Sequence, residues 1–177
     1  MRVKRTRLIT VRPAPGKRSQ GRLILAHGTR PVALGRSGLG ALKREGDGGT
    51  PLGRFTIRRV LYRADRVPRP STKLPLRAIR DNDGWCDDAA DRNYNRLIKL
   101  PTRRSAEGLK RADHLYDLVL VLGYNDLPRV RGRGSAIFMH LARPGHSPTE
   151  GCIALTQRDL LALLAEARPG SAIVVMR

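Results

Sequence analysis

The sequence predicts a mainly β domain with one C-terminal helix and long loops. Most apolar residues stand in short runs separated by turns rich in proline, glycine and serine, which is typical of strands. Only one segment, after Leu155, has the apolar spacing of an amphipathic helix. At 177 residues the chain suits a single domain over residues 1–177.

The apolar runs differ in length, and a longer run predicts a strand that is more completely buried. Residues 116–124 are almost continuously apolar, so we expect a strand in the middle of a buried sheet. Residues 134–141 predict the next buried strand, with His140 near its end. Shorter runs predict the other strands, at residues 8–11, 21–26, 31–34, 54–62, 97–100 and 171–176.

The predicted helix has a start signal, an apolar face and a stop signal. Thr156 is expected to cap its N-terminus, with Asp159 three residues later. The sequence Arg-Pro-Gly at 168–170 is expected to end it. Its apolar face is formed by Leu160, Leu163, Leu164 and Ala167.

The net charge of +20, from 35 basic and 15 acidic residues, would attract anionic polymers such as nucleic acid, anionic lipid or acidic cell-wall material. An arginine-rich composition spread over a solvated surface would give the same charge. Aromatic residues make up only 4% of the chain, so the stacking platforms of a single-strand binder are lacking. No apolar run is long enough for a transmembrane segment.

Two long segments lack strand or helix patterns. The glycine-rich run at 35–53 lacks the order of a phosphate-binding loop and is followed by a predicted strand, so we expect a shaped loop. Residues 64–95 contain three prolines and a cluster of aspartates, and differ from a calcium loop in glycine position and in having no closing glutamate. We expect them to form a solvated turn region that serves as a lid.

The two cysteines have opposite surroundings, and the sequence leaves open whether they pair. Cys86 stands among aspartates, whose charge disfavours a thiolate, so we interpret it as structural. Cys152 follows Gly151, whose freedom allows a tight turn with amide groups pointing at an oxyanion. Cys152 is therefore either a nucleophile or a buried structural cysteine.

A cysteine nucleophile needs a base, and His140 is the candidate. It stands twelve residues before Cys152 and ends a buried strand, which would hold the imidazole rigidly. The other histidines, His27, His114 and His146, stand next to turns.

The segment 140–155 resembles the active-site signature of the YkuD-type L,D-transpeptidases, in which a strand histidine precedes an S-x-G-C-[IV] motif bearing the nucleophile. The flanking sequences at 43–53, 85–88, 113–117 and 133–140 resemble the compact branch of that family, so the resemblance covers nearly the whole chain. It implies a β-sandwich-like catalytic domain, with Cys152 as nucleophile, His140 as base and the amides around Gly151 as oxyanion donors. Without an Asp or Asn partner, His140 needs a backbone carbonyl to fix its tautomer. No metal or cofactor is implied.

Three positions depart from the commoner S-H-G-C-I-R form. Thr149 and Glu150 stand for serine and histidine, and Ala154 stands for the arginine that would bind a substrate carboxylate. Arg133 and Arg143 are candidates to replace that arginine because they are close in sequence. Glu150 either orients a donor group or faces solvent.

The implied reaction is acyl transfer on peptidoglycan stem peptides, with the anionic cell-wall polymer as partner. Cys152 would attack the carbonyl of the third residue of a tetrapeptide stem, expel the terminal D-alanine and pass the acyl group to an amine. The alternatives are an L,D-carboxypeptidase-type cysteine hydrolase and a non-enzymatic basic protein that binds nucleic acid, which is the less expected partner.

This substrate would place the protein in the periplasm or cell envelope, yet Met1–Arg22 lacks the apolar segment of a standard signal peptide. The sequence leaves four explanations open: a removed leader, a misplaced start, a nonclassical export route, or action on cytoplasmic precursors.

Overall fold

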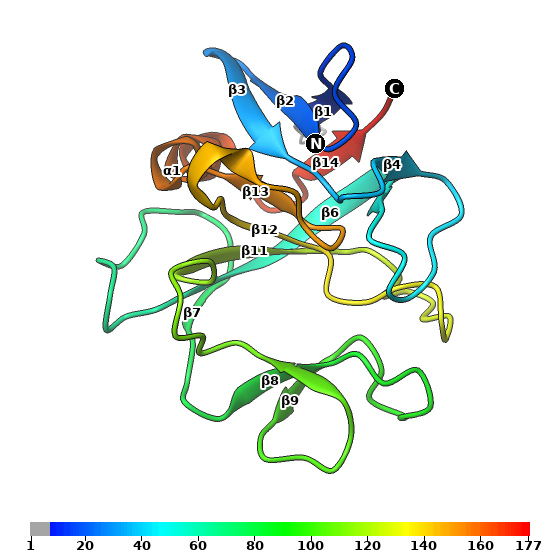
Figure 1. The fold of residues 1–177 in the computed structure, drawn as a ribbon. Helices are drawn as coiled ribbons and strands as arrows, with labels where there is room; N and C mark the ends of the chain where they lie inside the picture. Colours follow the sequence, from blue (N-terminus) through cyan, green and yellow to red (C-terminus); the bar gives the residue numbers. More distant parts are fainter. Residues whose placement is uncertain (1–7) are drawn as a thin grey trace, which may run out of the picture.

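The computed structural model describes residues 8–177, in which eight strands close into one mixed β-barrel (Figure 1). Residues 1–7, the start of the Met1–Arg22 stretch, lie outside the described residues. The barrel strands are β1 (Leu8–Pro13), β2 (Gln20–Leu25), β3 (Gly28–Ala33), β6 (Gly53–Tyr62), β11 (Leu118–Leu122), β12 (Phe138–Leu141), β13 (Ile153–Leu155) and β14 (Ala172–Val175).

The long strand β6 closes the barrel. Around the barrel the strand order is β11-β12-β13-β3-β2-β1-β14-β6, and β6 pairs back with β11. The first part of β6 pairs with β14, whereas its second part pairs with β11, where Tyr62 lies opposite Leu118. The pairs β1–β14 and β12–β13 are parallel and the other barrel pairs are antiparallel. A short strand, β7 (Leu76–Ala78), adds to β6 in parallel.

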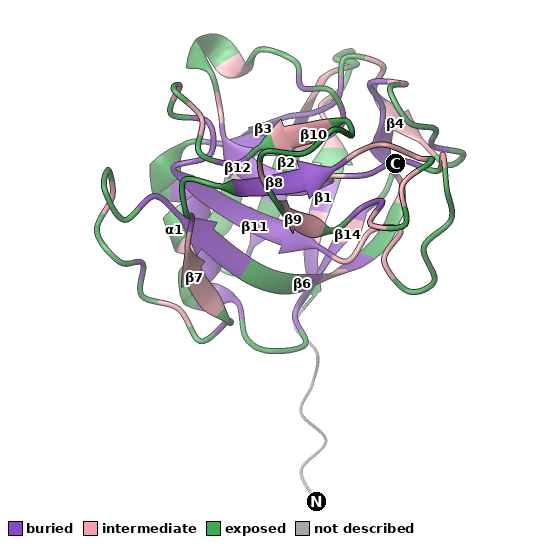
Figure 2. Ribbon diagram, turned by 90° about the horizontal axis from the view of Figure 1, so that it is seen from below, coloured by how far each residue is buried: buried purple, intermediate pink, exposed green. Residues whose placement is uncertain are grey.

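The apolar strand β11 separates two hydrophobic clusters, as its continuous apolar sequence predicted. Leu118, Leu120 and Leu122 pack into the barrel core, whereas Val119 and Val121 pack outside it with Trp85 and other residues. All five residues of β11 are buried, and Figure 2 shows this strand as buried along its length. Burial on both faces stabilises the strand because each apolar side chain leaves water.

The outer cluster is covered by a small sheet of three strands, which lies as a separate layer below β11 in Figure 1. Its strands are β8 (Asp83–Cys86), β9 (Leu97–Lys99) and β10 (Ala106–Gly108), in the order β10-β8-β9. The prediction of a solvated turn region at residues 64–95 is therefore wrong where β7 and β8 form.

Asp83 shows why that prediction failed. Its carboxylate is 1% exposed and accepts from Arg77 Nη2 at 2.6 Å, from the Arg80 N–H at 2.8 Å and from Lys99 Nζ at 3.0 Å. Although burial opposes ionisation, these hydrogen bonds keep the pKa of Asp83 below its usual value. An aspartate that composition alone places in solvent is thus buried with three partners, of which Arg77 and Arg80 are near in sequence and Lys99 comes from the next strand.

The helix α1 (Gln157–Glu166) forms as predicted. Thr156 is its N-cap and accepts from the Asp159 N–H at 3.2 Å, and the helix ends just before residues 168–170. Its buried face includes Leu160, Leu163 and Leu164, which join the barrel core. No helix in the described part of the chain is long and apolar enough to cross a membrane.

The glycine-rich run forms a shaped loop, as expected. It contains the two-residue strands β4 (Leu39–Gly40) and β5 (Thr50–Pro51), which pair in parallel, and it leads directly into β6. The prediction of a mainly β domain with one C-terminal helix and long loops is confirmed, and the main sheet of this domain closes into a barrel.

Candidate active site

The parallel pair β12–β13 brings His140 and Cys152 to one site. His140 lies opposite Ala154 in the pair, and Cys152 stands two residues before Ala154, just ahead of β13. Because side chains alternate along a strand, this spacing favours the same face for Cys152 and His140. Both residues line a cavity of 560 Å³.

The lining of this cavity carries both signs of charge. Its ionisable residues, apart from Cys152, His140 and Tyr116, are Glu45, Asp87, Glu107, Arg111, Arg143 and Glu150. In a chain of net charge +20 this lining is unusually rich in carboxylates. Such a surface suits a ligand that itself carries both ammonium and carboxylate groups.

The Cys152 thiol is held between two backbone groups of the segment that leads into β12. Sγ donates to the Ala136 carbonyl at 3.1 Å and accepts from the Phe138 N–H at 3.4 Å. Burial raises the pKa of Cys152 to about 12, and the negative charge of Glu107 adds to this effect. At neutral pH the resting residue is therefore a thiol.

His140 is arranged as a neutral base. Its Nδ1 lies 2.8 Å from the Leu141 carbonyl, which only accepts, so the proton is assigned to Nδ1 and Nε2 keeps its lone pair. Burial lowers the pKa of His140 to about 4, so the imidazole is uncharged at neutral pH. The expected backbone carbonyl partner is thus present.

Tyr116 supports the imidazole and links it to a carboxylate. The two rings meet edge to face with centroids 5.4 Å apart, and the Tyr116 hydroxyl donates to Glu107 Oε1 at 2.7 Å. The Arg111 guanidinium lies 5.1 Å from the Tyr116 ring centroid. Burial raises the pKa of Glu107. This cluster was not predicted from the sequence, although Tyr116 lies in the 113–117 motif that resembles the family.

The turn before Cys152 requires glycine at position 151. Gly151 has φ of 133°, and a Cβ there would lie 2.8 Å from the Gly49 carbonyl oxygen. Thr149 Oγ1 accepts from the Gly151 N–H at 3.1 Å and donates to the Cys152 carbonyl at 2.6 Å. Thr149 therefore shapes the turn, and the Gly151 amide already has a partner.

The candidates for binding a substrate carboxylate differ in position. Arg143 lines the cavity, whereas Arg133 lines a separate hollow with Arg44 and Arg131, and its carbonyl accepts from the Tyr124 hydroxyl. Ala154 is 1% exposed. The structure thus places only one of the two arginines at the site.

Glu150 stands at the solvent side of the cavity. Its side chain is 77% exposed, and it forms an ion pair with Arg36 at 2.8 Å. Of the two expectations, the structure agrees with the one that places Glu150 toward solvent, and the orienting role stays a prediction.

Asn95 is a further residue whose role was not predicted from the sequence. This buried amide accepts from Trp85 Nε1 at 2.9 Å and from the Ala136 N–H at 3.1 Å. Its Nδ2 donates to the carbonyls of Tyr124 and Asn125 at 2.9 and 2.8 Å. Ala136 has φ of 50°, unusual for a residue with a side chain, so Asn95 fixes a strained residue whose carbonyl faces the thiol.

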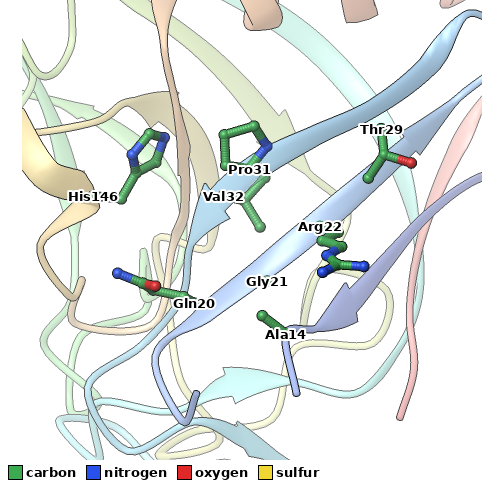
Figure 3. Close-up of a pocket in the computed structure, with 8 residues that line it drawn as sticks. All are labelled: Ala14, Gln20, Gly21, Arg22, Thr29, Pro31, Val32 and His146. Atoms are coloured by element: carbon green, nitrogen blue, oxygen red, sulfur yellow. The ribbon is translucent and has the colours of Figure 1, made fainter. Parts of the chain in front are cut away.

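Two other features lie apart from this site. Cys86 is buried and, like Cys152, free; burial and the charges of Asp91, Asp87 and Asp88 raise its pKa, in the direction expected from its neighbours. A hollow of 320 Å³ lies along β2 and β3, and its residues in Figure 3 include His146 from the 3₁₀ turn η1 (Pro144–His146) but neither cysteine. Among residues 8–177, no group of three or more His, Cys, Asp or Glu could hold a metal ion.

Residues 9–175 match the YkuD family, whose description is L,D-transpeptidase catalytic domain. Comparison with curated proteins gives no significant match.

Proposed function

Because the chain belongs to the YkuD family of L,D-transpeptidase catalytic domains, we propose that it is a cysteine transpeptidase acting on peptidoglycan stem peptides. The observation that carries this proposal is the presence of Cys152 and His140 in one cavity, with the imidazole proton on Nδ1. A thiol that shares a cavity with a neutral imidazole, whose Nε2 can accept a proton, provides the two groups that nucleophilic acyl transfer needs. The protein would work in the periplasm or cell envelope, where this substrate lies.

In the first half of the reaction, Cys152 becomes acylated. The thiol turns from the Ala136 carbonyl and gives its proton to His140 Nε2, and the sulfur attacks the carbonyl of the third stem residue. The tetrahedral oxyanion is assigned to the Cys152 N–H, because the Gly151 N–H donates to Thr149. The imidazolium then returns the proton to the leaving amine, and the terminal D-alanine departs.

In the second half, an amine takes the acyl group. A second stem peptide enters the cavity and its ammonium group first loses a proton to solvent. The neutral amine then attacks the thioester carbonyl while His140 Nε2 takes a proton from the nitrogen. The carbon–sulfur bond breaks, and the imidazolium returns that proton to the sulfur of Cys152. The cavity carboxylates attract this ammonium group, and Arg143 is the side chain proposed to hold a substrate carboxylate. If water replaced the amine, the same site would act as an L,D-carboxypeptidase.

Mass spectrometry of products from purified muropeptides tests the proposal. The wild type is expected to form cross-linked dimers, and Cys152→Ala to form none. Trimmed tripeptides without dimers would assign hydrolysis instead of transfer. A folded wild-type protein that gives neither product would refute a peptidoglycan substrate.

Covalent inhibition tests the nucleophile separately. A carbapenem is expected to add once to the wild type, on the peptide that contains Cys152. An adduct that persists in Cys152→Ala would contradict the assignment of Cys152.

A further inference from the structure

A lysine from the glycine-rich loop is buried against the turn that carries the proposed nucleophile. Lys43 is 5% exposed, and its chain passes between two glycines that flank the site. A Cβ on Gly134 would lie 2.9 Å from Lys43 Cε, and a Cβ on Gly151 would lie 3.2 Å from Lys43 Nζ. The ammonium group therefore lies against the residue that precedes Cys152.

The partner of this ammonium is itself fixed by the loop. Asp47 Oδ1 accepts from Lys43 Nζ at 2.7 Å and from the Gly49 N–H at 2.8 Å, and Oδ2 accepts from the Arg44 N–H at 2.7 Å. Although burial opposes ionisation, the hydrogen bonds from Lys43, Arg44 and Gly49 lower the pKa of Asp47. The loop thus holds a charged pair with its cation at Gly151.

A thiolate at Cys152 needs positive charge nearby because burial, the largest influence on the pKa of the thiol, opposes ionisation. Burial and Glu107 raise the pKa of Cys152, whereas the Phe138 N–H and Lys43 lower it. His140 is neutral at rest. The other titratable or charged groups that line the cavity are Glu45, Asp87, Arg111, Tyr116, Arg143 and Glu150.

We propose that Lys43 is an electrostatic positioning residue, whose buried ammonium stabilises the Cys152 thiolate as His140 removes the thiol proton. This inference rests on the proposed role of Cys152 as nucleophile. The alternative is that the Lys43–Asp47 pair only fastens the loop. The two roles predict different changes in the pKa of the Cys152 thiol. If Lys43 acts through its charge, removing this cation raises the pKa, whereas removing the anion Asp47 lowers it. If the pair only fastens the loop, the two substitutions do not have opposite effects.

The test measures the rate at which iodoacetamide alkylates Cys152, followed by mass spectrometry of the peptide that contains it, from pH 6 to pH 9. Below the pKa of the thiol, this rate follows the thiolate fraction. We expect Lys43→Met to react about tenfold more slowly at each pH, equivalent to one pKa unit, and Asp47→Asn to react faster than the wild type. Lys17→Met, at an exposed position, removes the same charge and is expected to react like the wild type.

Three outcomes would overturn the proposal: a Lys43→Met rate equal to that of Lys17→Met, an Asp47→Asn rate that falls with that of Lys43→Met, or an unchanged Asp47→Asn rate. Thermal unfolding of each variant identifies any that does not fold. The direction in which the alkylation rate of the other variant changes then decides between the two roles. Alkylation requires no stem peptide, so failure of this proposal is distinguishable from failure of the proposed transpeptidase reaction.

Discussion

The two reactive side chains are both held uncharged by burial. The pKa of Cys152 is raised to about 12 and that of His140 is lowered to about 4, so neither is ionised at neutral pH. At rest the thiolate fraction of Cys152 is therefore small, and the proposed reaction needs His140 to take the thiol proton. The burial of His140 also makes the stability of the fold depend on whether this imidazole is protonated.

The pKa of His140 predicts how stability changes with pH. The folded protein protonates His140 near pH 4, whereas the unfolded chain does so near pH 6.5, so stability falls as pH falls between these values. From pH 7.5 to pH 4.5, urea unfolding should show the wild type losing about 2 to 3 kcal/mol more than His140→Gln. The exposed His27→Gln should lose as much as the wild type. Equal losses in the wild type and His140→Gln would refute the buried neutral imidazole.

At the residue scale, the sequence identified the groups whose chemistry is recognisable by type and spacing. Cys152 and His140 are reactive residues on either side of a predicted turn. Lys43, Asn95 and Glu107 are not recognisable in this way, because their roles come from partners far along the chain. Lys43 lies against Gly134 and Gly151, and Asn95 bonds to Ala136.

At the element scale, the segment leading into β12 carries the strained backbone of the site, at Ala136. The predicted strand began at Gly134, but β12 begins at Phe138, because Gly134 and Ala136 have positive φ. This irregular segment presents the Ala136 carbonyl and the Phe138 N–H to the thiol. In a regular strand, these two backbone groups would instead bond to a neighbouring strand. The amide of Asn95 replaces part of that pairing.

Loss of the Asn95 amide should therefore destabilise the protein strongly. Asn95→Ala removes four hydrogen bonds and leaves buried backbone groups without partners, so we expect a loss of about 2 to 4 kcal/mol in urea unfolding. Asn93→Ala, two residues earlier and outside this network, should change stability by less than about 0.5 kcal/mol. Similar losses in both variants would contradict a specific role for Asn95.

The helix N-cap gives a smaller and more local effect. Thr156→Ala removes the acceptor of the Asp159 N–H, and we expect a loss of about 1 kcal/mol, measured by thermal unfolding. Thr156→Ser keeps the hydroxyl and should restore most of that loss. A Thr156→Ser variant as unstable as Thr156→Ala would mean that the methyl group, not the cap, matters.

The elements predicted from sequence are those with a local signal. Strands such as β11 and β14 have apolar runs, and α1 has a cap and an apolar face. The short strands β7, β8 and β10 have no such signal, since their stability comes from packing on β6 and β11 and from ion pairs such as those of Asp83. Local patterns carry no information about these long-range contacts.

At the scale of the whole molecule, closure of the barrel is a matter of pairing rather than composition. β6 is ten residues long and contacts β14, β11 and β7 along its length. The strand β6 was predicted, but nothing in its sequence states that its second part pairs back with β11. This closure places the 64–116 segment outside the barrel, where β10 and the residues after it supply Glu107 and Arg111 to the cavity.

The net charge is also a property of the whole molecule. Salt should weaken the attraction that this charge causes much more than it changes the reaction at the site. A charge of +20 should draw the protein to an anionic polymer, and salt screens this attraction. We expect binding to isolated sacculi, measured by co-sedimentation, to fall at least tenfold as NaCl rises from 0.05 M to about 0.5 M. The rate of carbapenem addition to Cys152, whose partly buried side chain lines the cavity, should change less than about threefold over the same range. Cys152→Ala should bind sacculi like the wild type, since the charge is unchanged. If sacculus binding were insensitive to salt, the attraction would have to come from specific contacts rather than from the basic surface.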